Sequence, residues 1–335
     1  KIAQFIKRFV DREGCMEFDV SAVCAIVEYS SRTAERQDKL STRFNHLAEI
    51  LCEAVTWAKL EGAELVTAAH IQKTIYEKEQ RMKLYEEKLD EMLEENVIMI
   101  DTEGAEIGQI NGLAVLDMGN YAFGNPSRIT ATTYVGKSGI VNIEKEARLS
   151  GQTHDKGVQI ITGFLGQTYA QNFPLSLSCR VCFEQNYNGI DGDSASSTEL
   201  YCILSSLAEL PIRQDLAVTG SVNQKGEIQA IGGVTHKIEG FFDLCRKRGL
   251  TGTQGVIIPV SNVKDLVLKD EVVQAVKEGL FHIYPISKID EGIELLMGLS
   301  AGKKNKAGNF PANSVHGRVM KKLKAFDKRA QGEEE

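Results

Sequence analysis

Residues 189–196, with the sequence GIDGDSAS, carry a serine among small residues directly before an expected helix. The start of a helix offers free backbone N–H groups and a partial positive charge. Both features suit an oxyanion that develops when a serine attacks a carbonyl group. The alternative is structural, since Asp193 or Ser194 could simply cap the helix. The pattern therefore makes Ser194 a candidate nucleophile that needs further support.

A serine hydroxyl is a weak nucleophile unless a neighbouring base takes its proton. None of the six histidines occupies a recognisable catalytic setting. Ser194 therefore still needs a base, which the residues around it do not identify by themselves.

Two other motifs resemble functional sites, but their residues and expected secondary structure argue against both. Gly136-Lys137-Ser138 resembles the end of a phosphate-binding loop, but Ala131 stands where that loop needs glycine. The segment joins two β-like runs, so a hairpin turn is expected, and no ATP hydrolysis by this chain alone. Cys179 and Cys182 form a C-x-x-C on an expected strand, where residues three apart face opposite sides. No metal site is predicted.

The composition of the chain argues against several classes of protein. The chain has 335 residues, 25% charged residues and a net charge of −7, which argues against a nucleic-acid partner. No apolar run in it approaches the roughly 18 to 20 residues of a membrane-spanning helix. The first residues lack the pattern of a signal peptide. Seven scattered cysteines fit reduced thiols, and the expected location is cytoplasmic.

The elements that must position these residues indicate an α+β fold. Residues 1–80 have helical periodicity, with Thr67 as the expected N-cap of a last helix, and residues 81–96 form a charged helical linker. Short β-like runs broken by glycine begin at residue 97, and helices alternate with strands after Gly192. Residues 97–300 are therefore expected to form a domain with mixed sheets. Residues 301–335 are expected to be a loose polar tail holding a helical turn or more.

GDSAS together with residues 211–240, PIRQDLAVTGSVNQKGEIQAIGGVTHKIEG, resembles the protease domain of the Lon family, closest to its LonB-like branch. Similar runs, INGLAV, IVNIEKEA and IITGFLGQ, extend the resemblance over about residues 97–300. The resemblance implies a Ser–Lys dyad of Ser194 and Lys237, the lysine lying in the motif GG-x-x-x-K. In this dyad Lys237 takes the Ser194 proton and returns it to the leaving amine. Lys237 lies near the start of an expected helix that buries Phe241 and Phe242. Burial and the positive helix end both lower the pKa of a lysine from its usual value of about 10.4, which supports this role. The resemblance also implies a serine endopeptidase that acts on unfolded or damaged proteins.

Further site residues follow from this resemblance alone. Thr219 matches the family threonine whose hydroxyl orients the lysine amine. Asp191 and Glu144 match acidic positions near the dyad, whose roles vary between relatives. Asp193 precedes the serine, as in the LonB-like branch. All four are supporting candidates.

Residues 1–80 resemble the small helical lid subdomain of the AAA+ module that precedes the protease domain in this family. Residues 28–51 match the lid helix with the sensor-2 arginine, for which Arg43 is the candidate and Arg32 and Arg36 are rivals. The large nucleotide-binding subdomain has no counterpart here, so a fragment of a longer protein is expected. The resemblance implies a homo-hexameric ring that uses ATP and Mg²⁺ in the intact protein, whose membrane anchorage stays open.

Two competing functions remain at this point. An inactive binding or assembly module would be free to lose Ser194, Lys237 or Thr219, yet all three are present. A nucleotide-handling enzyme is suggested by Lys137 and the lid, and is disfavoured by Ala131. A peptide-cleavage assay with and without ATP separates both from the peptidase.

Overall fold

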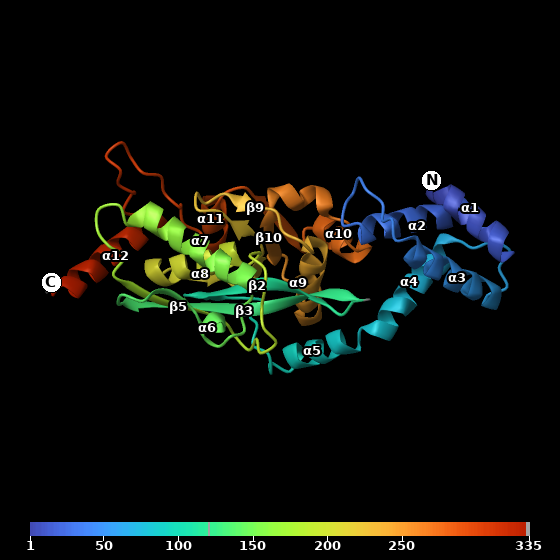
Figure 1. Cartoon of the computed structure of the whole chain (residues 1–335), viewed down its shortest axis with the longest axis horizontal. Helices are drawn as coiled ribbons and strands as arrows, with labels where there is room; N and C mark the ends of the chain where they lie inside the picture. The colour runs from blue at the N-terminus through green and yellow to red at the C-terminus, as the bar shows by residue number, and fades with distance from the viewer. Residues whose placement is uncertain (120, 333–335) are drawn as a thin grey trace. The chain divides into compact units, whose positions relative to one another are not determined.

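The computed structural model describes residues 1–119 and 121–332, which form two compact units. The smaller unit comprises residues 1–91, 117–122 and 264–268, and the larger unit comprises the remainder. The first is helical and the second combines a mixed sheet with helices, so the α+β expectation is confirmed (Figure 1). The division after residue 91 falls inside the segment expected to be a linker.

The smaller unit is a helical bundle around an apolar core. Ile26, Leu47, Ile50 and Ile71 are fully buried at its centre. Thr67 begins the fourth helix in a capping box with His70, which confirms the expected N-cap. The helices are α1 (Ile2–Glu13), α2 (Val20–Thr33), α3 (Phe44–Leu60), α4 (Ala68–Met82) and α5 (Leu84–Glu94), the last of which continues into the larger unit.

The larger unit is built on a seven-stranded sheet with the order β11-β10-β7-β2-β3-β5-β4. Its pairings are mixed, because β10 is parallel to β11 and β7 whereas β3 is antiparallel to β5. The larger unit also contains two two-stranded sheets, β1-β6 and β8-β9. The bounds are β1 (Ala105–Glu106), β2 (Gln109–Asp117), β3 (Ala122–Val135), β4 (Gly139–Asn142), β5 (Leu177–Phe183), β6 (Ile212–Arg213), β7 (Leu216–Val218), β8 (Ser221–Val222), β9 (Ile228–Gln229), β10 (Gly255–Pro259) and β11 (His282–Ile286).

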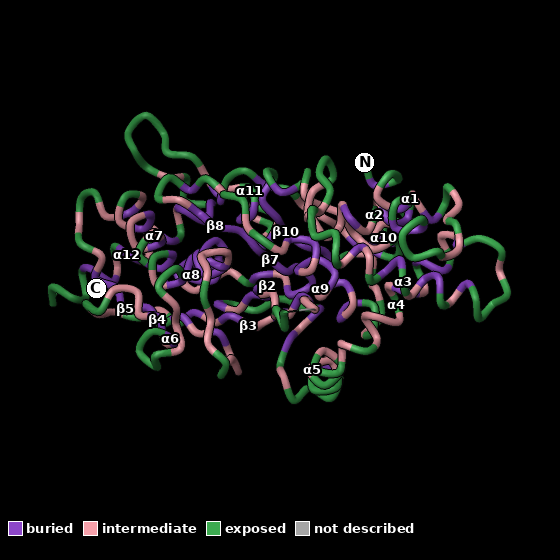
Figure 2. Tube along the Cα trace, turned by 45° about the vertical axis from the view of Figure 1, so that its right-hand side comes forward, coloured by how far each residue is buried: buried purple, intermediate pink, exposed green. Residues whose placement is uncertain are grey.

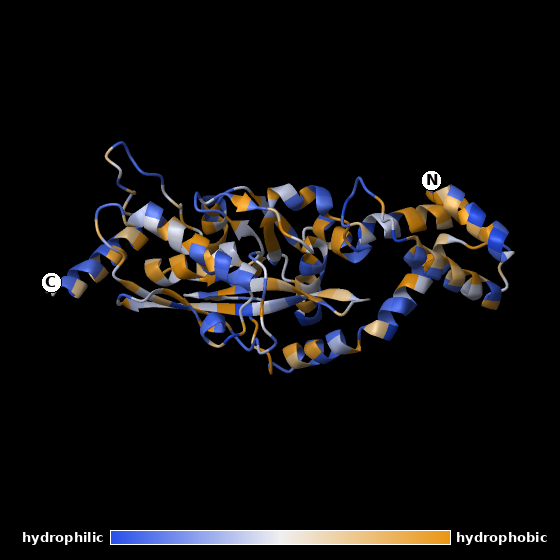
Figure 3. Cartoon of the chain, viewed as in Figure 1, coloured by the Kyte–Doolittle hydropathy of each residue, from blue (hydrophilic) through white to orange (hydrophobic). Residues whose placement is uncertain are grey.

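Helix α8 (Ser196–Ala208) forms the centre of the larger unit. Nearly all of its residues are buried, and Figure 2 shows it inside the larger unit. Figure 3 shows that it and strand β10 carry mainly apolar residues. The other helices are α6 (Ile143–Glu146), α7 (Gln152–Tyr169), α9 (Val234–Arg248), the 3₁₀ helix η1 (Val260–Asp265), α10 (Asp270–Lys277), α11 (Ile289–Met297) and α12 (Val315–Gln331).

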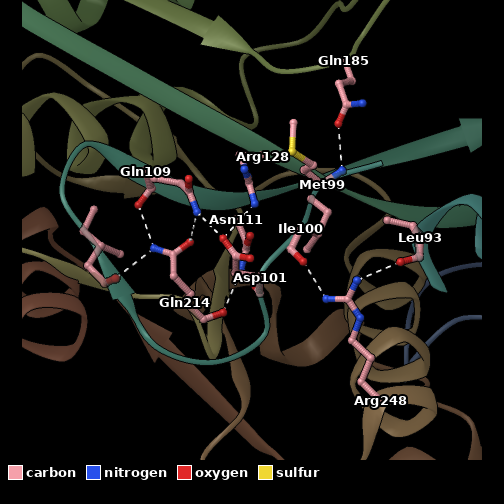
Figure 4. Close-up of polar contacts among 11 residues, drawn as sticks. Leu93, Met99, Ile100, Asp101, Gln109, Asn111, Arg128, Gln185, Gln214 and Arg248 are labelled. Carbon is pink, nitrogen blue, oxygen red and sulfur yellow. Dashed lines mark hydrogen bonds and ion pairs between the residues drawn. The ribbon is translucent and has the colours of Figure 1, made fainter. Parts of the chain in front are cut away.

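The first residues of the larger unit are tied to it by polar contacts (Figure 4). Arg248 donates to the backbone carbonyls of Ile100, at 2.6 Å, and Leu93, at 2.9 Å. Asp101 accepts a hydrogen bond from Arg128 at 2.8 Å. The chain therefore enters strand β2 from a fixed position, which helps to define the sheet on which the candidate site is built.

Helix α12 confirms the expectation of a helical turn or more after Ala301, whereas the expectation that this part of the chain is loose is wrong. Val315, Val319, Leu323 and Phe326 are buried in the main core of the larger unit. Ser314 caps the helix by accepting a hydrogen bond from the backbone N–H of Gly317 at 3.1 Å. The lysines between these apolar positions lie on the other faces of the helix, so the polar composition concealed an amphipathic pattern.

The expected hairpin at residues 136–138 is also wrong. The segment does connect strands β3 and β4, but both pair with β5, which lies between them. A hairpin requires its two strands to pair with each other. Instead, strand β5, which follows α7 in the chain, lies between β3 and β4 and pairs with both.

Candidate functional site

Ser194 lies in the turn that leads into α8, two residues before the helix begins. Its carbonyl oxygen accepts hydrogen bonds from the backbone N–H of Gly220, at 2.7 Å, and from Oγ1 of Thr219, at 3.3 Å. In return, Ser197 donates its backbone N–H and its hydroxyl to the carbonyl of Gly220. The serine backbone is therefore tied on both sides to the segment that follows β7.

Lys237 lies in the first turn of α9, which begins after Gly233 in the left-handed conformation, φ 66°. This end of α9 packs directly on the backbone of β3. A Cβ atom on Gly124 would lie 2.0 Å from the carbonyl oxygen of His236, and one on Gly240 would lie 2.2 Å from that of Gly124. Two glycines thus permit the close approach that carries the lysine to its place.

The three residues of the expected dyad and its support come together. The Lys237 amine nitrogen Nζ lies 2.8 Å from Oγ of Ser194 and 3.1 Å from Oγ1 of Thr219. Lys237 is only 3% exposed and Thr219 only 2%. A distance of 2.8 Å between a hydroxyl oxygen and an amine nitrogen allows direct proton transfer. The site can therefore activate a serine without a histidine.

Asp191 and Asp193, two of the three acidic candidates, accept hydrogen bonds beside the serine turn. Asp191 is exposed and accepts backbone hydrogen bonds from Thr153, at 3.1 Å, and His154, at 3.3 Å, at the start of α7. Backbone N–H donors, that of Gly192 first, lower the pKa of Asp191. Asp193 accepts from the hydroxyl of Ser221 at 2.9 Å, a contact that the sequence did not indicate.

Glu144 is buried, and its Oε1 accepts the backbone N–H of Phe183 at 2.7 Å. This bond holds the end of β5, from which the chain continues toward the Ser194 turn. The carboxylate therefore fixes the end of the strand that precedes the serine turn.

The two cysteines of the C-x-x-C motif are poorly suited to be an alternative nucleophile. Burial raises the pKa of Cys179 and of Cys182 to about 12, which disfavours the reactive thiolate. All seven cysteines are free. Within residues 1–119 and 121–332, no cluster of histidine, cysteine and acidic side chains has the arrangement of a metal site.

The phosphate-loop resemblance at residues 136–138 does not fit a nucleotide. The backbone N–H of Gly136 donates to the carbonyl of Ser176 at 3.2 Å, and that of Ser138 donates to the hydroxyl of Ser178 at 3.2 Å. Amides that donate within the protein cannot also cradle a phosphate. Lys137 is exposed between them.

The candidate arginines of the smaller unit differ in their contacts. Arg43 is exposed at the N-cap of α3. Arg32 donates to the carbonyl of Val267 at 2.8 Å, and Arg36 pairs with Asp38. Arg43 therefore stays the candidate for a nucleotide contact.

Two family comparisons match separate parts of the chain. Residues 17–81 match the AAA+ ATPase LID domain of archaeal LonB, and residues 181–298 match the C-terminal proteolytic domain of Lon protease (S16). The second match contains the Ser194 turn, Thr219 and Lys237. A helical LID unit and an α/β unit with a lysine buried against a serine define a Lon-type proteolytic segment.

The chain belongs to the Lon protease family. It is 44% identical over 218 residues to a Lon protease homolog of Escherichia coli, covering 64% of this chain and 37% of that protein. It is 35% identical over 319 residues to one of Haemophilus influenzae, covering 93% of this chain and 52% of that protein.

An archaeal Lon protease of Pyrococcus abyssi is 31% identical over 323 residues, with 91% of this chain and 29% of that protein covered. The chain thus spans about a third to a half of the length of these curated relatives. Among the described residues, no helix combines the length and the apolar character that crossing a membrane requires.

Proposed function

We propose that this chain is a serine endopeptidase in which Ser194 is the nucleophile and Lys237 its general base. The observation that carries the proposal is the 2.8 Å distance between Oγ of Ser194 and Nζ of a lysine that is 3% exposed. Cleavage of an unstructured fluorogenic peptide by the purified chain, compared with its Ser194→Ala variant, tests the proposal.

The proposed reaction proceeds in two halves. Lys237 takes the hydroxyl proton as Oγ of Ser194 attacks the carbonyl carbon of the substrate, whose oxygen becomes an oxyanion. The lysine ammonium then protonates the leaving amine, the C–N bond breaks, and an acyl-enzyme remains. Water repeats the attack with its proton passing to Lys237, and Ser194 recovers a proton as the acid product leaves.

Burial is what makes a lysine usable as the base. Removing an ammonium group from water disfavours its charged form, and the first turn of α9 adds the positive end of a helix. The hydroxyls of Ser194 and Thr219 provide hydrogen-bond partners that carry no charge. They orient the amine without stabilising its protonated form as strongly as a carboxylate would.

The oxyanion is assigned to the backbone amides of the turn before α8. Across residues 1–119 and 121–332, the amides of Asp193, Ser194 and Ala195 donate no backbone hydrogen bond. They adjoin the nucleophile, and the positive end of α8 follows directly. Such donors suit the charge that develops in the transition state.

Replacing Thr219 tests the support given to the amine. Thr219→Val keeps the shape of the side chain but removes the hydroxyl that lies 3.1 Å from Nζ. We expect kcat to fall by about tenfold or more, because the amine loses one of its positioning partners. Thr219→Ser restores the hydroxyl and should recover most of the loss. A Thr219→Val enzyme as active as wild type would remove Thr219 from the site.

For the intact protein we propose the arrangement that the family implies. The proteolytic units would form a homo-hexameric ring in the cytoplasm that degrades unfolded or damaged polypeptides, delivered with ATP and Mg²⁺. No nucleic acid is expected as a partner. Arg43, exposed at the start of α3, is the residue of this chain that would contact the nucleotide.

ATP should have no effect on this chain by itself. With ATP and Mg²⁺ we expect no phosphate release above background, because the amides around Lys137 are already committed to the protein. Peptide cleavage should stay within about twofold of the rate without nucleotide. Phosphate release that disappears in Lys137→Ala would show that the segment binds nucleotide after all.

A further inference from the structure

A buried histidine connects α7 to the turn that carries Ser194. His154 is 1% exposed and its ring packs edge-on against Phe183, with centroids 5.4 Å apart. The ring hydrogen-bonds to the backbone of Gly192, two residues before the serine. The backbone N–H of the same residue donates to Asp191 at 3.3 Å. One residue of α7 thus contacts two consecutive residues of the turn.

Glu199 lies on the other side of the imidazole ring, in the first turn of α8. Its Oε1 lies 3.5 Å from Nε2 of His154, and both side chains are 1% exposed. Within the described residues, neither carboxyl oxygen of Glu199 nor Nε2 of His154 has a hydrogen-bond partner. A buried carboxylate without partners is unfavourable, which favours a protonated carboxyl group facing the ring.

The charges around the pair determine where that proton resides. Burial, followed by the charge of Glu144, raises the pKa of Glu199 well above its ordinary value. Burial also lowers the pKa of His154, against the opposing effects of Glu144, Asp155 and Asp191. Both shifts favour the uncharged forms, a protonated carboxyl group beside a neutral imidazole.

A neutral imidazole donates through one nitrogen and accepts through the other. With a protonated Glu199 facing Nε2, that nitrogen is the acceptor and Nδ1 carries the hydrogen. Nδ1–H is then the donor to the carbonyl oxygen of Gly192. Because the peptide between Gly192 and Asp193 is planar and trans, fixing this carbonyl also fixes the Asp193 N–H on the opposite side.

We propose that His154, held in one tautomer by Glu199, is a positioning residue that sets the Gly192–Asp193 peptide and thereby the place of Ser194 against Lys237. The inference rests on the proposed function and adds a residue that acts through the backbone. Lys237 supplies the base, while His154 determines how the nucleophile turn is presented to it. The histidine exchanges no proton with the substrate.

The first test compares two replacements of His154 in peptide cleavage. His154→Phe keeps a ring against Phe183 and removes both nitrogens, and we expect kcat to fall by about 30- to 100-fold with KM little changed. His154→Asn places an amide donor near the position of Nδ1 and should recover about tenfold of that loss. Equal losses in the two variants, in step with their melting temperatures, would reduce His154 to a packing residue.

The second test concerns Glu199. Glu199→Gln offers an amide N–H to Nε2 and so preserves the tautomer, whereas Glu199→Leu does not. We expect Glu199→Leu to lower kcat by about tenfold and Glu199→Gln to recover most of it. Tyr169→Phe, which removes a buried hydroxyl bonded to His316, controls for the general cost of deleting a buried polar contact. A loss that is the same for Glu199→Gln and Glu199→Leu would overturn the assignment.

A third measurement does not depend on cleavage. Nitrogen-15 NMR of the imidazole ring in Ser194→Ala should show the neutral Nδ1–H tautomer of His154 near pH 7. The Nε2–H tautomer would contradict this inference and leave the dyad untouched. Conversely, full cleavage by Ser194→Ala would contradict the proposed function, whatever the tautomer. The two failures are therefore distinguishable.

Discussion

Ser194→Ala should abolish peptide cleavage, with a loss of at least about 10³-fold, because removing the nucleophile leaves only binding and oxyanion stabilisation. The fold should persist, since the change deletes one oxygen in a turn and keeps the backbone bonds of Ser194 to Gly220 and Thr219. Initial rates on an unstructured fluorogenic peptide, with the melting temperature of each variant, measure both effects.

The neighbouring serine provides a matched control. Ser196 is buried, and its hydroxyl accepts the backbone N–H of Val222 at 3.0 Å, which is a structural task. Ser196→Ala should lower the melting temperature and retain cleavage. Loss of cleavage in Ser196→Ala together with turnover by Ser194→Ala would move the nucleophile to the second serine.

Lys237→Arg should be nearly as damaging as Lys237→Ala, again by at least about 10³-fold. A guanidinium group stays protonated at any pH that the protein tolerates, so it cannot accept the serine proton. An arginine keeps the positive charge, so comparable losses would show that the site needs a base and not merely a cation. Lys237→His should retain at most a trace of activity, and only if its ring nitrogen reaches Ser194.

Loss of folding should not explain the inactivity of the Lys237 variants, and a further variant tests this. Lys237→Met replaces a buried amine by an apolar chain of similar length, which removes a desolvation cost. We expect its melting temperature to equal or exceed that of the wild type while cleavage is lost. An active Lys237→Met enzyme would contradict the assignment of the base.

Local patterns predicted much of this molecule. Thr67 was identified as an N-cap because capping depends on residues within one turn. The same holds for the serine turn before α8 and for Lys237 in the first turn of α9. Short strands broken by glycine indicated the mixed sheet for the same reason. Each of these signals lies within a few neighbouring residues.

The missed features depend on contacts between distant segments. His154 lies 38 residues before Gly192, and nothing in its own neighbourhood indicates that its ring meets that carbonyl. Strand β5 likewise lies between β3 and β4 through pairing with segments distant in the sequence, which local patterns do not indicate. Helix α12 is different, because Val315, Val319 and Leu323 already had helical spacing beneath the lysines.

The pH dependence of kcat/KM in the wild type beside Lys237→Arg tests the Ser–Lys dyad most directly. A base must lose its proton to work, so the wild-type rate should rise with pH. The apparent pKa should be roughly 1 to 3 units below that of a free lysine. Lys237→Arg should show no such rise in whatever activity remains. A rise with the pKa of an ordinary histidine that survives unchanged in Lys237→Arg would show that another residue is the base.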